Sequence, residues 1–218
     1  MQIAIDGPAG AGKSTVARMI ADRLGFIYID TGAMYRALTW KALARKVDLQ
    51  DEEKLYDLAC NTDIYFSKLA DQQNVICDDV DISDEIRSPL INTNVSIVAA
   101  QPRVRIVMVK KQQDMARMND VVMDGRDIGE QVLPDADFKF YVTASIEERA
   151  RRRILEMKKQ GFASDEQSVR QQIEDRDRMD QERELGALKI LDDAIVIDTS
   201  LLSIDEVLNQ MLAIIGEM

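Results

Sequence analysis

Histidine is absent from this chain of 218 residues, and sulfur chemistry is limited to Cys60 and Cys77. Without imidazole, histidine-dependent triads and general bases are excluded, as are most zinc sites. Two cysteines without partners at metal-ligand spacing indicate ordinary buried thiols in a reducing compartment, so we expect a cytoplasmic protein. No apolar run approaches the roughly 20 residues that a membrane span needs. The chain begins with a strand pattern at residues 2–5, so we expect neither a signal peptide nor a membrane partner.

Acidic residues outnumber basic ones by 39 to 28, which gives a formal net charge of -11. The excess is concentrated in residues 48–85, which hold 12 acids and two lysines. This charge disfavours nucleic acid as a partner, although a small anion in a local pocket stays compatible with it. Apolar residues make up 46% and charged residues 31%, a balance that suits one folded globular domain.

Short apolar segments alternate with longer segments of helical spacing, the pattern of an α/β fold. The segments are apolar on both faces, as in a parallel sheet that helices cover on both sides. The sequence therefore predicts a five-stranded parallel sheet with strands at residues 2–5, 27–29, 121–123, 138–142 and 194–197.

Several helices carry start and stop signals. The first follows Gly12 and is expected to end at Gly25, and another is expected to run from Pro102 through Met118. Capping-box spacing is found at three pairs, which are Ser145 with Glu148, Ser164 with Gln167, and Ser203 with Glu206. Gly161 is expected to end the helix that Ser145 opens.

The acidic residues 48–85 interrupt the alternation. They predict a helix at 52–59 and small antiparallel strands at 64–66, 74–77 and 80–82. Two interpretations stay open: a solvated surface addition, and a mobile lobe that binds substrate.

The first helix follows a complete phosphate-binding motif, Gly-x4-Gly-Lys-Ser, which continues into a threonine. Its residues are Gly7, Pro8, Ala9, Gly10, Ala11, Gly12, Lys13, Ser14 and Thr15. The glycines let backbone N–H groups surround a phosphate, and the helix adds the positive end of its dipole. We expect Lys13 to reach the β and γ phosphates and the Ser14 hydroxyl to bind magnesium.

Two aspartates end apolar strands. Asp124 follows residues 121–123, the position of a carboxylate that accompanies magnesium. Asp30 follows residues 27–29, and it would face the same phosphate end if that strand lay next to the first one.

The arginines favour a small-molecule kinase over other nucleotide-binding proteins. The Asn-Lys-x-Asp motif of a GTP switch is absent, and a motor ATPase would be larger. Arginines crowd the helix opened by Ser145, at positions 149, 151, 152 and 153. In the next helix, Arg176, Asp180 and Arg183 have the spacing of one helix face. Guanidinium groups suit bidentate phosphate binding, and the break at residues 161–163 suits a lid that excludes water.

Four motifs resemble those of the bacterial cytidylate kinase family, and the resemblance runs from end to end. They are residues 5–15, residues 30–36 (Asp-Thr-Gly-Ala-Met-Tyr-Arg), residues 124–129 (Asp-Gly-Arg-Asp-Ile-Gly) and residues 176–183 (Arg-Asp-Arg-Met-Asp-Gln-Glu-Arg). The family transfers the γ-phosphate of ATP, bound with Mg²⁺, to CMP or dCMP. The resemblance implies the P-loop nucleotide kinase fold, with a core (1–35, 103–145 and 185–218), a monophosphate-binding lobe (36–102, with a β insertion at 63–83) and a lid (146–184).

The resemblance also implies roles for residues at matching positions. Contacts with the acceptor nucleotide fall to Thr31, where some relatives have serine, and to Arg36, Ser96, Arg105, Arg126, Asp127, Arg176 and Asp180. Among these, Arg36 grips the acceptor phosphate, Ser96 and Asp127 read cytosine, and Asp180 holds the ribose hydroxyls. Catalytic roles fall to Lys13, Arg126, Arg149, Arg152 and Arg183, and the magnesium ligands are Ser14 and Asp124.

The residues alone leave other functions open. A kinase for UMP or another small acceptor would share everything except base recognition, and a nucleotide-dependent regulatory protein would transfer nothing. The partners that the resemblance implies are ATP and CMP or dCMP, and we expect a monomer.

Overall fold

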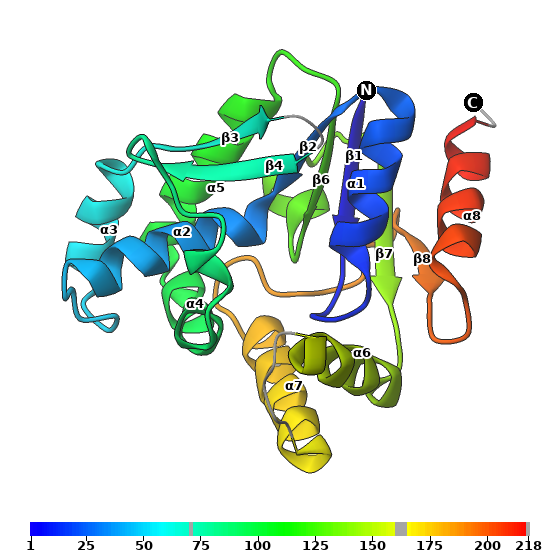
Figure 1. The fold of residues 1–218 in the computed structure, drawn as a ribbon. Coiled ribbons are helices and arrows are strands. Elements are labelled where there is room, and N and C mark those ends of the chain that lie inside the picture. Colours follow the sequence, from blue (N-terminus) through cyan, green and yellow to red (C-terminus); the bar gives the residue numbers. More distant parts are fainter. Residues whose placement is uncertain (70–71, 160–164, 217–218) are drawn as a thin grey trace. The chain divides into compact units, whose positions relative to one another are not determined.

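Five parallel strands form the central sheet of the computed structural model, in the order β2-β6-β1-β7-β8 (Figure 1). The strands are β1 (Gln2–Asp6), β2 (Ile27–Asp30), β6 (Val121–Gly125), β7 (Phe138–Thr143) and β8 (Ile195–Asp198). All five predicted strands are confirmed, with ends that differ by at most two residues. β6 separates β2 from β1, so the adjacency on which the expectation for Asp30 depended is not present.

The structure describes residues 1–69, 72–159 and 165–216. The chain divides into two compact units. Unit 1 comprises Met1–Tyr28 and Met118–Met218, and unit 2 comprises Ile29–Arg117. The described residues contain no helix that is both long and apolar enough to cross a membrane.

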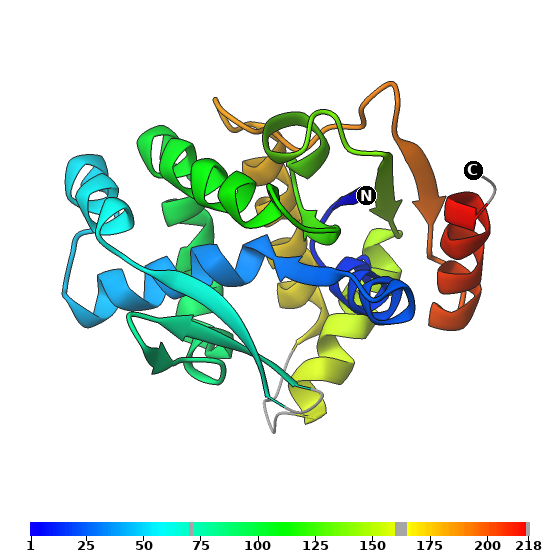
Figure 2. The same cartoon turned by 90° about the horizontal axis from the view of Figure 1, so that it is seen from above.

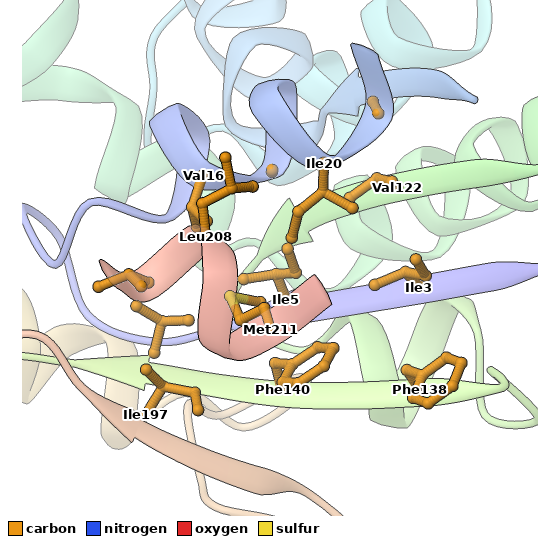
Figure 3. Packing of buried hydrophobic residues seen from close by; sticks show 14 of the residues in the cluster. Ile3, Ile5, Val16, Ile20, Val122, Phe138, Phe140, Ile197, Leu208 and Met211 are labelled. Atoms are coloured by element: carbon orange, nitrogen blue, oxygen red, sulfur yellow. The ribbon is translucent and has the colours of Figure 1, made fainter. Parts of the chain in front are cut away.

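The core of unit 1 lies between the sheet and two helices, α1 (Lys13–Leu24) and α8 (Ile204–Gly216). Figure 3 shows this packing, in which side chains of both helices meet those of the strands. The buried residues labelled there are Ile3, Ile5, Val16, Ile20, Val122, Phe138, Phe140, Ile197, Leu208 and Met211. Alternate residues of β1 and β7 face these helices, which is how the apolar strands position the loop that follows β1.

Unit 1 also contains a pair of helices, α6 (Ile146–Lys159) and α7 (Glu166–Gln181), with a small core of their own around Ala150 and Ile173. The Ser145 cap is confirmed, because its hydroxyl accepts the Glu148 N–H at 3.2 Å. Ser203 and Glu206 cap α8 reciprocally, also as expected. Gly161, Ser164 and the break at residues 161–163 lie outside the described residues. At the start of α7 the Asp165 side chain is the cap.

Unit 2 joins four helices to a three-stranded antiparallel sheet of order β3-β4-β5, which Figure 2 shows beside α2. Its helical elements are α2 (Thr31–Ala44), α3 (Glu52–Cys60), η1 (Glu85–Arg87), α4 (Pro89–Ala100) and α5 (Pro102–Ala116), and its strands are β3 (Ile64–Leu69), β4 (Gln72–Cys77) and β5 (Val80–Asp81). The predicted antiparallel strands are therefore confirmed. The helix expected to reach Met118 ends two residues earlier.

A buried lysine of α2 ties this small sheet to the helices. Lys41 Nζ contacts Asp78 at 2.5 Å, Thr62 Oγ1 at 2.8 Å and the Asn61 carbonyl at 3.2 Å. Trp40, the only tryptophan, precedes it on the same helix. Cys77 is buried as expected, and burial raises the pKa of its thiol to about 11. Cys60 is exposed, so the expectation that both thiols are buried is wrong for this residue.

Candidate active site

The phosphate-binding motif forms a tight loop between β1 and α1. Gly7 has a φ of +145°, and a Cβ at this position would lie 2.0 Å from the Val142 carbonyl oxygen of β7. Gly12 has a φ of +92° and directly precedes α1. Larger residues would clash at the first position and be strained at the second, which explains why the motif requires glycine here.

Lys13 is the first residue of α1, and its side chain is only 5% exposed. Its ammonium group donates to the Pro8 carbonyl at 2.8 Å, so the side chain folds back over the loop. Burial and the nearby charge of Arg126 lower the pKa of Lys13 to about 7, against the opposing effect of Asp124 and Asp180. A buried ammonium beside another cation favours binding of an anion with several charges.

Ser14 and Asp124 are neighbours, as the strand pattern suggested. The Ser14 hydroxyl donates to Asp124 Oδ2 at 2.8 Å, and the Tyr28 hydroxyl donates to Asp124 Oδ1 at 2.7 Å. Tyr28 had no role in the sequence analysis, because its contact crosses from β2 to β6. These two hydrogen bonds fix the orientation of the carboxylate.

The Ser14 hydroxyl and the Asp124 carboxylate are hard oxygen donors, the type that Mg²⁺ prefers. The described part of the chain holds no group of three or more Cys, Asp or Glu side chains placed around a common metal position. A Mg²⁺ ion bound by one or two protein groups takes its other ligands from phosphate oxygens and water.

Asp180 of α7 lies among arginines of unit 1. Arg126 Nε donates to its Oδ2 at 2.6 Å, and Arg183, just past the end of α7, donates to Oδ1. Burial acts to raise the pKa of Asp180, but Arg126, Arg183 and Arg176 together lower it to about 2. Asp180 is therefore an ionised carboxylate with at least two guanidinium partners. The expected grouping of Arg176, Asp180 and Arg183 is present, and Arg126 joins it, which the sequence analysis did not predict.

Arg149 and Arg152 of α6 contact the back of the phosphate-binding loop. Arg149 donates to the Ala9 carbonyl at 3.2 Å and pairs with Asp177 at 2.7 Å. Arg152 donates to the Ala11 carbonyl at 3.2 Å. Both arginines thus hold backbone carbonyl groups of the loop.

Thr199 and Asp177 are partners that the sequence analysis missed. The Thr199 hydroxyl donates to the Ala11 carbonyl at 3.0 Å, and Arg152 Nη1 donates to the same hydroxyl at 3.0 Å. Arginine spacing along a helix identifies the cations, but it does not identify which residues across the fold they contact.

A pocket of about 340 Å³ opens beside the loop in unit 1. It is bordered by Gly12 of the loop, by Thr15 of α1, by Arg151 and Arg152 of α6, and by residues 202–204 before and within α8. The sequence analysis noted Ser203 only as a helix cap and gave residues 202–204 no part in a site, because their contribution to the pocket is apolar surface and one hydroxyl.

The other expected acceptor residues belong to unit 2, on helices α2, α4 and α5, which pack against one another. Thr31 begins α2 and is buried, and Arg36 pairs with Asp30 at 3.0 Å. Asp30 caps α2 by accepting the Ala33 N–H at 2.7 Å, so its role here is local.

Ser96 on α4 and Arg105 on α5 are also buried in unit 2. The Arg105 guanidinium lies over the Tyr35 ring at 5.6 Å and donates to the Ala99 carbonyl at 3.1 Å. The Arg105 guanidinium is thus held by a carbonyl group and a ring of unit 2.

Asp127 follows β6 in unit 1 and is buried. The residues expected to contact the acceptor are therefore divided between the units: Thr31, Arg36, Ser96 and Arg105 belong to unit 2, and Arg126, Asp127, Arg176 and Asp180 belong to unit 1.

The phosphate-binding loop comes at the end of the first strand of a parallel sheet, and two helices later in the chain, α6 and α7, carry the arginines. This arrangement defines a P-loop kinase of small molecules. A family model described as cytidylate kinase matches residues 3–217, so the chain belongs to the cytidylate kinase family. It is an ATP-dependent nucleoside monophosphate kinase that phosphorylates CMP or dCMP.

Curated relatives agree with the family. The chain is 49% identical to a cytidylate kinase of Bacillus cereus (strain G9842) and 48% identical to one of Bacillus thuringiensis (strain Al Hakam), with 99% of this chain and 96% of each relative covered. A crystal structure of an uncharacterized protein from Eubacterium ventriosum shares the fold, with a TM-score of 0.53 and 15% identity over 100% of this chain and 99% of that one. The family resemblance of the sequence motifs is thereby confirmed.

Proposed function

We propose that the loop from Gly7 to Thr15 binds the triphosphate of ATP, with Lys13 on the β and γ phosphates. The buried Lys13 ammonium and the backbone N–H groups at the start of α1 support this assignment. Ser14 and Asp124 would hold Mg²⁺, which would supply neutralising charge to the phosphates of ATP. The hydrogen bond between Ser14 and Asp124, at 2.8 Å, is the observation that carries this assignment.

The donor nucleoside would occupy the pocket beside Gly12 and Thr15. Its position next to the loop, its apolar wall of Leu202 and Ile204, and the guanidinium groups at its edge suit a purine base.

The acceptor roles that the family resemblance implies stay part of the proposal for each unit by itself. In unit 2, Arg36 would hold the acceptor phosphate, and Ser96 and Arg105 would contact its base. In unit 1, Arg176 would hold the phosphate, Asp127 would read the base, and Asp180 would hold the ribose hydroxyls. The ionised state of Asp180 supports this last role, because a carboxylate is a strong acceptor for hydroxyl groups. The division into core, monophosphate-binding lobe and lid stays part of the proposal, as do the monomeric state and action in the cytoplasm.

The chemical step requires alignment and charge neutralisation more than covalent participation. The attacking atom of the acceptor is already an ionised phosphate oxygen, so the reaction needs no strong general base. A chain without histidine is compatible with this chemistry. Lys13, Arg126 and Arg183 would stabilise the charge that develops on the migrating group. The same role for Arg149 and Arg152 stays a prediction, and their contacts with loop carbonyls support a contribution to loop geometry.

The test is ADP formation measured with a panel of monophosphates. We expect turnover with CMP and dCMP far above that with UMP, AMP or GMP. If turnover were highest with another monophosphate, the proposed recognition of cytosine would be wrong. If no ADP formed in response to any acceptor, phosphate transfer would be excluded altogether.

Asp127→Ala sharpens the test of base recognition. We expect it to raise the KM for CMP roughly tenfold or more while the KM for ATP changes little, since a lost buried hydrogen bond is worth about 1–3 kcal/mol. Glu130→Ala is a matched control, because Glu130 lies three residues away and pairs with Lys189 at the surface. An equal rise in both KM values for Asp127→Ala would reassign this residue.

A further inference from the structure

Asp6 is a buried carboxylate with no role in the mechanism above. It is the last residue of β1, it directly precedes Gly7 of the phosphate-binding loop, and its side chain is 7% exposed. Its Oδ1 accepts the Ile128 N–H at 2.8 Å, and its Oδ2 accepts the Gly129 N–H at 2.9 Å. Each oxygen of one carboxylate therefore binds one of two consecutive amides.

These two amides follow Arg126 and Asp127 immediately. The strand register places Asp6 opposite Gly125, so the carboxylate reaches across the sheet edge to the segment that leaves β6. With both amides held, little freedom is left for the backbone of Asp127, which has a φ of -146° and a ψ of 29°. Arg126 is held at its other end by Asp180.

The surroundings of Asp6 do not favour a charge. Burial and the neighbouring Asp127 carboxylate raise the pKa of Asp6 to about 6, although the two amides and Lys13 oppose them. Tyr141, its neighbour on β7, also lies within range of its charge. A neutral residue would fill the same space at lower cost to folding, so the carboxylate is better explained by its two hydrogen bonds.

We propose that Asp6 is a positioning residue, whose carboxylate anchors the Ile128 and Gly129 amides and thereby sets Arg126 and Asp127 relative to the phosphate-binding loop. The proposal deepens the function proposed above, because it rests on the contact of Asp127 with the acceptor base. It links the donor loop and part of the acceptor site through a single side chain.

The primary test is Asp6→Asn, which keeps the shape but replaces one acceptor oxygen by a donor, so that one backbone N–H faces another donor. We expect the KM for CMP to rise about tenfold and the KM for ATP to change less than about twofold. Asp137→Asn is the matched control, because Asp137 accepts the Gln2 N–H at 2.6 Å at the opposite end of β1. We expect both KM values of this control to stay within about twofold of wild type.

The pH dependence provides a readout that a purely structural role would not give. Protonation of Asp6 in the wild type imitates the Asn side chain, so the ratio of the two KM values for CMP should approach one as the pH falls below about 6. Ionisation of CMP itself affects both proteins equally and cancels in the ratio. The amide proton shifts of Ile128 and Gly129, followed by NMR, should titrate together near the same pH in the wild type and stay constant in Asp6→Asn.

The outcomes separate this proposal from the proposed function. If the two amide shifts do not titrate, or if Asp6→Asn affects ATP and CMP equally, the positioning role is overturned. If Asp127→Ala is not selective for CMP while the amides titrate as expected, the base-reading assignment is overturned, and with it the functional part of this inference. Should Asp6→Asn fail to fold, the NMR titration of the wild type still decides whether the anchor exists.

Discussion

Lys13 in unit 1 and Lys41 in unit 2 are both buried, with exposures of 5% and 4%, yet their surroundings differ. The Lys41 ammonium contacts a carboxylate, a hydroxyl and a carbonyl group, all supplied by unit 2. The Lys13 ammonium donates to a carbonyl group, and the charge of Arg126 acts to lower its pKa. Lys41 is thus neutralised within the fold, whereas Lys13 belongs to a cluster that a phosphate chain would neutralise.

The difference shows what a buried charge contributes in each unit. In unit 2 the buried Lys41 ammonium holds the three-stranded sheet against the helices, and its removal leaves polar groups without a partner. Unit 1 keeps cations together where their repulsion costs stability, and the arrangement becomes favourable when an anion binds. Substitution of the two lysines should therefore have opposite signatures.

The largest effect is expected for Lys13→Ala. Loss of a cation that stabilises the migrating phosphate should lower kcat by about 10²-fold or more, as for other electrostatic contacts of this type. The melting temperature should not fall below that of the wild type, because the buried cation destabilises the folded state. Calorimetric melting and steady-state kinetics measure the two quantities, and more than about a tenth of the wild-type rate would contradict the assigned role.

Lys41→Met should show the reverse. The variant leaves Thr62 and the Asn61 carbonyl without their cation, while Asp78 is near the surface and regains water. We expect a loss of about 2 kcal/mol in the free energy of unfolding, or roughly 4–8 °C in Tm. The kcat of the folded enzyme should stay within about twofold. An unchanged Tm with a large drop in kcat would remove the distinction between the two lysines.

The smallest effect expected is the uptake of protons when ATP binds. With a pKa of about 7, Lys13 is largely neutral at pH 8.5 in the free protein, and a bound triphosphate should raise this pKa and protonate it. ATP binding should therefore take up close to one proton at pH 8.5 and much less at pH 6.

Titration calorimetry in buffers with different ionisation enthalpies measures this uptake, and Lys13→Ala should abolish it. Equal uptake at both pH values would show that the cation cluster does not lower the pKa of Lys13. The same pKa shift makes folding depend on pH, because a charged Lys13 destabilises the folded protein. This destabilisation is complete below about pH 7 and disappears as the pH rises toward 10.5.

The sequence was sufficient for the sheet and for the donor loop. The five strands are short apolar segments, four of which end at Asp or Gly. The Gly-x4-Gly-Lys-Ser motif has a strong local requirement for backbone with positive φ. Ser14 and Asp124 could be assigned to the same magnesium ion in advance, because the motif places Ser14 just after the loop and Asp124 comes at the end of an apolar strand.

The contacts that cross the fold could not be predicted in this way. The bonds of Asp6 to residues 128 and 129 depend on β6 lying next to β1, whereas the sequence alone also allowed β2 at that position. Arg149 and Arg152 also contact loop carbonyls, which every residue possesses, so no side-chain pattern reveals these contacts. Tyr28 and Thr199 likewise act through a hydroxyl whose partner is distant in the chain.

The position of Trp40 has a practical consequence. Since it is the only tryptophan and lies on α2, its fluorescence reports on unit 2, whereas far-UV circular dichroism averages the helices of both units. Denaturation curves from the two signals would coincide if the whole chain unfolds in one cooperative transition. If they separate, the same experiment measures how much stability each unit has of its own.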